Sequence, residues 1–414
     1  MRRFSLLLAA ALLVTPAPGQ AQDKPAGPTF EPYGFALLHA FFADGIFVNK
    51  DNAYQVQRGG AAAADSTGFY QFSVRGSRLG FRVGNLPTGY LGATGSLVLE
   101  YDVQGGFFVG TGGTLSPATT RSWLSPGMRL RLANGKLDWK TDYGAWQLLF
   151  GQDFGLLAPV FANSVTYGTD PVFVRAGKIY IRSPQARLTY SNTFDMVTVN
   201  VAAAALAAIE SDADAVDYGP GNKSRMPSLE GRAMVTVKPD KDIFGTVNVG
   251  YHMHTRRYTD AATKRDLDAS ILSFGLDATL TQYAQVKGEY YMNEGADDTY
   301  LGILGPKTGA NLAAFKLIKS TGYWAQLTLK PIPELWIAGG FGNEKADNSS
   351  KSALAVNTWF ENTQTHVALI SNASKNLAIG LEYVMVESKY TSAAGAADQK
   401  SKANQLSLST RFSF

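Results

Sequence analysis

Hydrophobic and polar residues alternate strictly at the end of the chain. In the last ten residues, QLSLSTRFSF, the apolar Leu406, Leu408, Phe412 and Phe414 are separated by polar residues. A two-residue period places successive side chains on opposite faces of a β-strand, so this segment predicts a strand with one apolar face. Chain ends of soluble domains usually fray. We therefore expect Gln405–Phe414 to pair along its whole length, with its apolar face in an apolar environment.

The same alternation recurs from about Glu31 onward, where we mark sixteen segments with a two-residue period. In Ala284–Asn293, for example, one face is mostly Gln, Lys, Glu and Asn, and the other is Ala, Val, Gly, Tyr and Met. Alternation over about ten residues is what a half-buried strand requires. It is also roughly the length of a tilted strand that crosses a bilayer.

The connections between these segments alternate in length. Short ones, such as Thr141–Gly144 and Pro239–Asp242, are rich in Gly, Pro, Asn and Asp, which favour tight turns. Long ones lie between them, and Gln152–Pro184 and Asn293–Ser320 exceed the roughly 12–15 residues usual in a soluble domain. Short turns on one side and long loops on the other are typical of a barrel that spans a membrane.

An even number of antiparallel strands brings the last strand beside the first and removes both sheet edges. The pattern therefore predicts an all-β fold, a closed antiparallel transmembrane β-barrel of sixteen strands with short periplasmic turns and long outer loops. Gln405–Phe414 is expected to pair with the strand around Tyr33–Phe42, with Phe414 at the inner interface, where aromatic residues are favoured. An edge strand of a soluble β-protein is the alternative interpretation.

The one long apolar run lies at the start of the chain. Phe4–Val14 follows two arginines and precedes the small-residue site Gly19–Ala21, which is the pattern of a secretory signal peptide. The run is too short for a transmembrane helix, which needs about 20 apolar residues. We expect a signal peptide over 1–21, a short periplasmic segment over 22–30, and the barrel over 31–414 with a constriction loop over 151–184.

Composition narrows the setting of the protein. The 414 residues include no cysteine, and an exported chain without disulfides fits a bacterial envelope. There are 38 Lys and Arg against 34 Asp and Glu, and removing the signal peptide leaves 36 − 34 = +2, which argues against a nucleic-acid partner. We expect the bacterial outer membrane as the location, with its lipid and lipopolysaccharide as partners.

Three stretches carry a resemblance to a known family. YGFALLHAFF (Tyr33–Phe42) opens the predicted barrel, RGSRLGFR (Arg75–Arg82) lies in the second strand, and RSPQARLTY (Arg182–Tyr190) follows the third long connection. With the sixteen strands and the C-terminal Phe, the sequence resembles trimeric bacterial outer-membrane porins, within them the DcaP-like and phosphate-selective groups. The resemblance implies a homotrimer that prefers small anions such as dicarboxylates.

Several arginines alternate with lipid-facing residues. In RLGFRV, Leu79, Phe81 and Val83 face one way, so Arg78 and Arg82 must face the lumen, because a basic charge at the bilayer midplane costs about 2–4 kcal/mol. Arginine stays charged and presents a planar fork to carboxylate or phosphate. A wall of such side chains would draw anions in and hand them onward. The predicted anion-binding set is Arg78, Arg82, Arg129, Arg131, Arg187 and Arg232.

The fourth predicted strand needs a change of register. Leu130 and Leu132 set its lipid face, and we expect a bulge near Asn134–Gly135. The alternative interpretation of the arginines is that they pair with acids of the third long connection, such as Asp153 and Asp170, and mainly hold that connection in place.

The third long connection, Gln152–Pro184, contains more apolar residues than a loop lying free in water would carry. We expect it to fold into the lumen and narrow it, with Asp153, Asp170, Arg175 and Lys178 near the constriction. The alternatives are that it packs over the mouth of the barrel or at a trimer contact.

Other candidate chemistry is weak. His252 and His254 share a strand face, but no third ligand is evident, so we expect neither a metal nor another cofactor. The sequence contains no Gly-x-Ser-x-Gly or His-Glu-x-x-His motif, and we expect no enzyme. The predicted function is passive diffusion of small hydrophilic solutes with a preference for dicarboxylates or phosphate-like anions. A non-selective porin, a barrel enzyme and an adhesive barrel are the alternatives.

Overall fold

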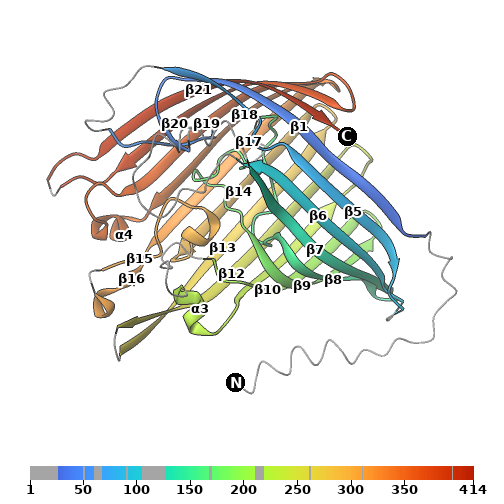
Figure 1. Ribbon diagram of the computed structural model, residues 1–414, viewed down its shortest axis with the longest axis horizontal. Helices are drawn as coiled ribbons and strands as arrows, with labels where there is room; N and C mark the ends of the chain where they lie inside the picture. The colour runs from blue at the N-terminus through green and yellow to red at the C-terminus, as the bar shows by residue number, and fades with distance from the viewer. Residues whose placement is uncertain are drawn as a thin grey trace.

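The computed structural model describes residues 27–49, 52–59, 68–89, 92–104, 127–166, 170–209, 219–260, 263–309, 311–393 and 395–414. The expected signal peptide and the whole of the long connection at 105–126 lie outside these ranges. A closed antiparallel sheet dominates the described residues (Figure 1). None of the helices found there is long and apolar enough to cross a membrane.

The wall has sixteen strand positions, because β4 and β5 both pair with β1 and form one interrupted strand. The wall strands are β1 (Thr29–Ala43), β4 (Phe69–Ser73) with β5 (Arg78–Pro87), β6 (Thr94–Gln104), β7 (Gly127–Thr141), β8 (Gly144–Phe154), β9 (Arg182–Phe194), β10 (Val197–Leu206), β11 (Ser228–Val237), β12 (Phe244–Asp260), β13 (Thr263–Thr281), β14 (Ala284–Glu294), β17 (Lys319–Ile332), β18 (Leu335–Ala346), β19 (Trp359–Asn372), β20 (Leu377–Tyr390) and β21 (Gln399–Ser413).

Smaller elements lie between wall strands at the outer end of the barrel. They are β2 (Phe47–Asn49), β3 (Asn52–Val56), α3 (Pro220–Ser224), η3 (Asp298–Tyr300), β15 (Lys307–Thr308), η4 (Leu312–Ala314), β16 (Lys316–Leu317) and α4 (Asn348–Ala353). β2 pairs with β3, and β15 pairs with β16.

The last strand closes the barrel as its alternation predicted. β21 pairs with β1 from Phe35 opposite Ser413 to Ala43 opposite Gln405. The side chains of Leu406 and Leu408 are about half exposed on the outer face, at 47% and 53%. The intervening serines are buried on the inner face, so the two-residue period separates an apolar exterior from a polar lumen.

Short turns occupy one end of the barrel and longer connections the other. β7 and β8 are joined at 142–143, β9 and β10 at 195–196, and β13 and β14 at 282–283. The predicted alternation is confirmed, with one departure at the outer end. There β12 and β13 run 17 and 19 residues and are joined at 261–262, so they extend as a long hairpin instead of ending in a loop.

The register change in β7 lies earlier than predicted. Glu100 pairs with Leu132 and its neighbour Tyr101 pairs with Leu130, so Arg131 is the extra residue of a bulge. Leu132 is therefore aligned with the inward Glu100, and its assignment to the lipid face was wrong. Beyond the bulge the alternation changes phase, which explains why the sequence pattern looks shifted near Gly135.

Candidate functional site: the lumen wall and its inward loop

The connection between β8 and β9, residues 155–181 and here named L3, crosses the lumen. Its backbone N–H groups donate to wall carboxylates on the far side, from Val160 to Glu289 at 3.0 Å and from Val165 to Glu382 at 2.7 Å. Glu289 lies on β14 and Glu382 on β20, whereas L3 leaves the wall at β8. The prediction that the third loop folds into the lumen is confirmed.

The apolar residues of L3 explain why it leaves water. Val160 and Phe173 pack against Trp324 of β17, and the Phe173 and Trp324 rings stack with centroids 5.4 Å apart. The facing strand provides space, because a Cβ at Gly342 would lie 2.1 Å from the backbone oxygen of Ala176. A side chain at this position would therefore prevent L3 from seating.

Lys178 holds L3 together. Its side chain is fully buried, and Nζ donates to the backbone oxygen of Ala158 at 2.6 Å and to Glu289 Oε2 at 2.9 Å. Burial lowers the pKa of Lys178, and the Glu289 carboxylate opposes that shift. The Lys178 ammonium is enclosed by protein atoms and paired with Glu289. A solute in the lumen therefore cannot contact it directly.

Arg175 joins L3 to the first outer connection. Its Nη1 donates to Gln55 at 2.7 Å, and its guanidinium lies over the Tyr54 ring, 4.8 Å from the centroid. Gln364 of β19 binds both segments, accepting from the Phe173 N–H at 2.6 Å and donating to the backbone oxygen of Ala53 at 2.9 Å. The β2–β3 hairpin and L3 thus share anchors on one wall.

Arginines cluster on the other wall, along β5, β7 and β9. Three guanidiniums surround the buried Asp102 carboxylate: Arg129 at 2.7 Å, Arg131 at 3.8 Å and Arg182 at 4.0 Å. Arg129 keeps 43% of its side chain exposed. Glu100 also pairs with Arg131, so two carboxylates face the three guanidiniums and these five groups keep a surplus of one positive charge.

The other arginines near this cluster have distinct surroundings. Arg131 also pairs with Glu100. Arg78 lies over the Phe35 ring at 5.1 Å. Arg82, near the periplasmic end of β5, pairs with Glu31 at 2.8 Å, with both side chains more than half exposed. Arg82, Arg129 and Arg131 are thus paired with acids, as the alternative interpretation expected. These acids lie on wall strands, however, and not in the third long connection.

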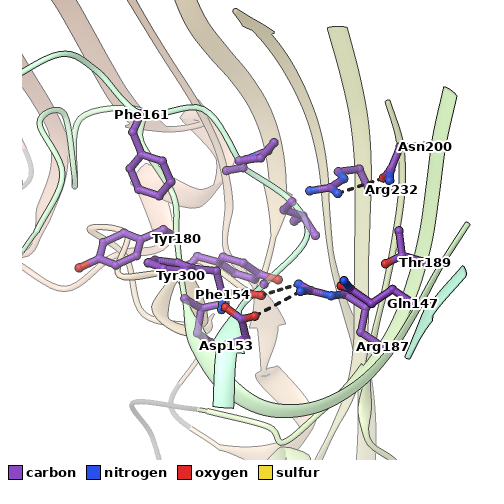
Figure 2. Close-up of a pocket in the computed structure, with 15 residues that line it drawn as sticks. Gln147, Asp153, Phe154, Phe161, Tyr180, Arg187, Thr189, Asn200, Arg232 and Tyr300 are labelled. Carbon is purple, nitrogen blue, oxygen red and sulfur yellow. Dashed lines mark hydrogen bonds and ion pairs between the residues drawn. The ribbon is translucent and has the colours of Figure 1, made fainter. Parts of the chain in front are cut away.

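A cavity of about 360 Å³ lies between L3 and the inner faces of β8–β11 (Figure 2). Arg187 donates to Asp153 at 3.2 Å and to the backbone oxygen of Phe154, and Arg232 donates to Asn200 at 3.2 Å. The other residues that line the cavity are Gln147, Gly155, Leu157, Ala158, Pro159, Phe161, Tyr180, Ile181, Thr189 and Tyr300.

Asp170 forms a hydrogen bond within L3. It accepts a hydrogen bond from Tyr180, and burial together with the Asp170 carboxylate raises the pKa of Tyr180 well above its ordinary value. Asp170 and Asp153 are therefore held in different places, Asp153 by a wall arginine and Asp170 by a loop tyrosine.

Sequence reasoning missed Arg182 and Tyr300. Alternation through Ala186 and Leu188 assigns the position of Arg182 to the lipid face, but this residue is the first of β9, where L3 joins the strand and the alternation does not yet hold. Tyr300 comes from the connection at 295–318, here named L6, and its hydroxyl donates to Glu230 of β11. The only sequence signal for this contact was the length of the connection, which carries a tyrosine.

The two histidines belong to this L6 contact. His252 Nε2 and His254 Nδ1 lie 2.9 Å apart, and His252 Nδ1 lies 2.9 Å from the Tyr300 hydroxyl. Among the residues that the structure describes, no group of three or more His, Cys, Asp or Glu side chains is arranged to hold a metal ion. The cluster joins L6 to β11 and β12.

Solved structures share this architecture. The outer membrane channel DcaP of Acinetobacter baumannii superposes with a TM-score of 0.69 at 16% identity, covering 94% of this chain and 98% of that one. OmpT of Vibrio cholerae gives 0.52 at 12% identity over 94% and 99%, and OmpF of Salmonella typhi gives 0.52 at 11% over 94% and 98%. No protein-family model and no curated protein matches the sequence. At these identities the likeness establishes a shared fold, a closed sixteen-stranded barrel of the outer-membrane porin type.

Proposed function

We propose that this protein is a porin of the bacterial outer membrane that lets small hydrophilic solutes diffuse passively and prefers anions. A closed barrel with an apolar outer face and a polar inner face satisfies its backbone within a bilayer. The fold shared with DcaP, OmpT and OmpF supports a channel. The short sequence resemblances support a place near DcaP-like porins and, with it, a homotrimer.

The observation that carries the anion preference is the sharing of Asp102 by Arg129, Arg131 and Arg182. On the opposite wall, Glu289 and Glu382 accept hydrogen bonds from L3 and so are covered by the loop. The electrostatic potential in the space between L3 and the arginine-bearing strands is therefore expected to be positive and to favour anions. L3 is proposed to form the constriction.

The cavity beside Arg187 and Arg232 is proposed as a resting position for the anion. Its polar side offers guanidinium and amide donors, and its other side is the apolar surface of L3. Carboxylate and phosphate groups fit such forks, which agrees with small carboxylated or phosphorylated solutes.

Planar-bilayer recordings test the proposal. In a KCl gradient, the reversal potential of the wild type is expected to show chloride preference, and trimers are expected to insert with three equal current steps. Replacing Arg129 and Arg182 by Gln removes two of the three guanidiniums around Asp102 and is expected to lower the chloride-to-potassium permeability ratio several-fold. The control Arg257→Gln, on the outer β12–β13 hairpin, is expected to leave the ratio unchanged.

The second candidate is a non-selective porin, favoured by the pairing of Arg131 with Glu100 and of Arg187 with Asp153. It predicts the same ohmic current but no change of reversal potential in the double variant. A folded protein that conducts no current would refute both candidates.

A further inference from the structure

Two carboxyl groups meet where L6 packs against the wall strand β18. Asp297 of L6 and Glu344 of β18 are both fully buried, and their carboxyl groups interact directly. Asp297 Oδ2 accepts a hydrogen bond from the Leu304 N–H at 2.8 Å. Glu344 Oε1 accepts one from the Ile303 N–H, also at 2.8 Å. The pair therefore fastens the backbone of L6 to the barrel wall.

The other buried acids of the lumen each have a basic partner. These pairs are Asp102 with Arg129, Glu100 with Arg131, Asp153 with Arg187, Glu230 with His252, Glu289 with Lys178, and Glu382 with His366.

The pair formed by Asp297 and Glu344 differs from these acids. Within the part of the chain that the structure describes, neither carboxyl group forms an ion pair with a basic side chain. Arg256 pairs with the adjacent Asp298 at 2.6 Å, and Arg175 acts on Glu344 only at longer range. The chain therefore buries two acids side by side and supplies no cation to balance them.

Three oxygen atoms at this contact are left over. Asp297 Oδ1, Glu344 Oε2 and the hydroxyl of Tyr291 on β14 form no hydrogen bond of standard geometry with the described residues. The Tyr291 side chain is fully buried and lies next to Glu344. Buried polar atoms are almost always paired in native proteins, so three such oxygens at one place indicate a partner that the chain itself does not supply.

Two glycines make room for these oxygens. A Cβ at Gly302 would lie 2.1 Å from Asp297 Oδ1, and a Cβ at Gly322 would lie 2.6 Å from the Tyr291 hydroxyl. A side chain at either position would displace one of the oxygens, so the local backbone is suited to keeping them together.

The charges decide what kind of partner fits. Two ionised carboxylates are costly to bury next to each other without compensation. Burial and the Glu344 carboxyl accordingly raise the pKa of Asp297 well above its ordinary value, so the cation-free contact retains a proton. One proton compensates only one of the two charges, whereas a divalent cation compensates both. Carboxylate and hydroxyl oxygens are the ligands that hard cations such as Ca²⁺ prefer.

We propose that Asp297, Glu344 and Tyr291 bind a calcium ion that fastens L6 to the barrel wall. Calcium is favoured over magnesium because its coordination is flexible, whereas Mg²⁺ usually keeps several waters, for which a fully buried contact leaves little room. Backbone or water oxygens would complete the ligand shell. Because calcium displaces the retained proton, its binding strengthens as the pH rises. The site goes beyond the proposed function and does not depend on anion preference in the lumen.

The test measures calcium binding to the detergent-purified barrel after treatment with EDTA and removal of the chelator. Calcium chloride is titrated calorimetrically at mildly alkaline pH into the wild type, Asp297→Asn, Glu344→Gln and Tyr291→Phe. Tyr291→Phe removes one oxygen and no charge, so it keeps the test decisive if a carboxyl variant folds poorly. The matched control is Glu294→Gln at the start of L6, whose partly exposed carboxylate lies 3.3 Å from Lys319.

The wild type is expected to bind one calcium ion per chain. The affinity is expected to fall at least tenfold in either carboxyl variant, to fall less in Tyr291→Phe, and to stay unchanged in the control. Calcium is also expected to raise the protection of L6 amides against hydrogen exchange, relative to EDTA, in the wild type but not in Asp297→Asn. Equal calcium binding by all variants would overturn the proposal. So would a wild type that binds no calcium and whose L6 protection depends on pH alone, because that result assigns the contact to a shared proton.

Discussion

The anchoring of L3 by Glu382 gives a sharp prediction. L3 donates four hydrogen bonds to this carboxylate, from Ser164 Oγ at 2.6 Å and from Val165 N, Thr166 N and Thr166 Oγ1 at 2.7 Å each. His366 Nε2 lies 2.8 Å from the same group. Glu382→Gln keeps the size and one acceptor oxygen but removes the charge.

The expected cost follows from these contacts. A hydrogen bond to a charged group contributes about 1.5–3 kcal/mol and a neutral one about 0.5–1.5, so losing the charge weakens three bonds to the retained oxygen by about 1 kcal/mol each. The lower desolvation cost of the amide offsets part of this loss. A net weakening of about 2–3 kcal/mol raises the population of detached L3 roughly 30- to 150-fold.

Single-channel recording detects this change, because a detached L3 alters the width of the lumen. Glu382→Gln is expected to show added current noise and new conductance levels, while the barrel still resists unfolding in detergent. The control is Glu387→Gln on the same strand, whose outward carboxylate lies 3.6 Å from Lys402 and contributes at most about 1 kcal/mol. If the two variants give the same current traces, the anchoring argument fails.

Two further predictions concern the inward loops. Gly342→Ala places a Cβ against the Ala176 backbone oxygen and is expected to unseat L3 at a cost of about 1–3 kcal/mol, whereas Gly339→Ala, where a Cβ meets nothing within 4 Å, is expected to leave the current traces unchanged. Burial and the neighbouring Glu344 carboxyl raise the pKa of Asp297 in L6 well above its ordinary value. L6 is therefore held most firmly at a pH below the ordinary pKa of an aspartate, and its seating weakens as the pH rises through the raised pKa of Asp297. After division by the intrinsic, base-catalysed exchange rate, the protection of L6 amides is expected to fall at high pH in the wild type but not in Asp297→Asn, and an equal pH dependence of protection in both would contradict this.

The strands could be predicted because each wall residue meets one of two contrasting environments. Leu406 and Ser407 must face lipid and lumen respectively, and a two-residue period records that choice in the sequence. The register error in β7 shows the limit of this signal. Arg131 adds one residue to the strand, and the sequence shows only that the phase differs on either side, not where the extra residue lies.

The inward loops could be predicted in outline but not in contact. Excess apolar residues indicated that L3 leaves water, yet the roles of its charges depend on which wall groups they meet. Lys178 looks like a constriction residue from sequence, but it is enclosed by backbone oxygens and Glu289. The carboxylate of Glu289 lies 111 residues further along the chain, and no local pattern specifies that partner.

The placement of acids also bears on selectivity. A lumen with nearly balanced charge can favour one sign if the other sign is used to hold structure. Glu289 and Glu382 accept hydrogen bonds from backbone N–H groups of L3. The loop therefore covers their negative charge and shields it from the lumen. The side chain of Arg129 is 43% exposed, and its guanidinium shares the Asp102 carboxylate with Arg131 and Arg182. The proposed anion preference would then depend on L3 staying seated, so unseating L3 is expected to uncover the acids, to reduce selectivity and to raise the current noise.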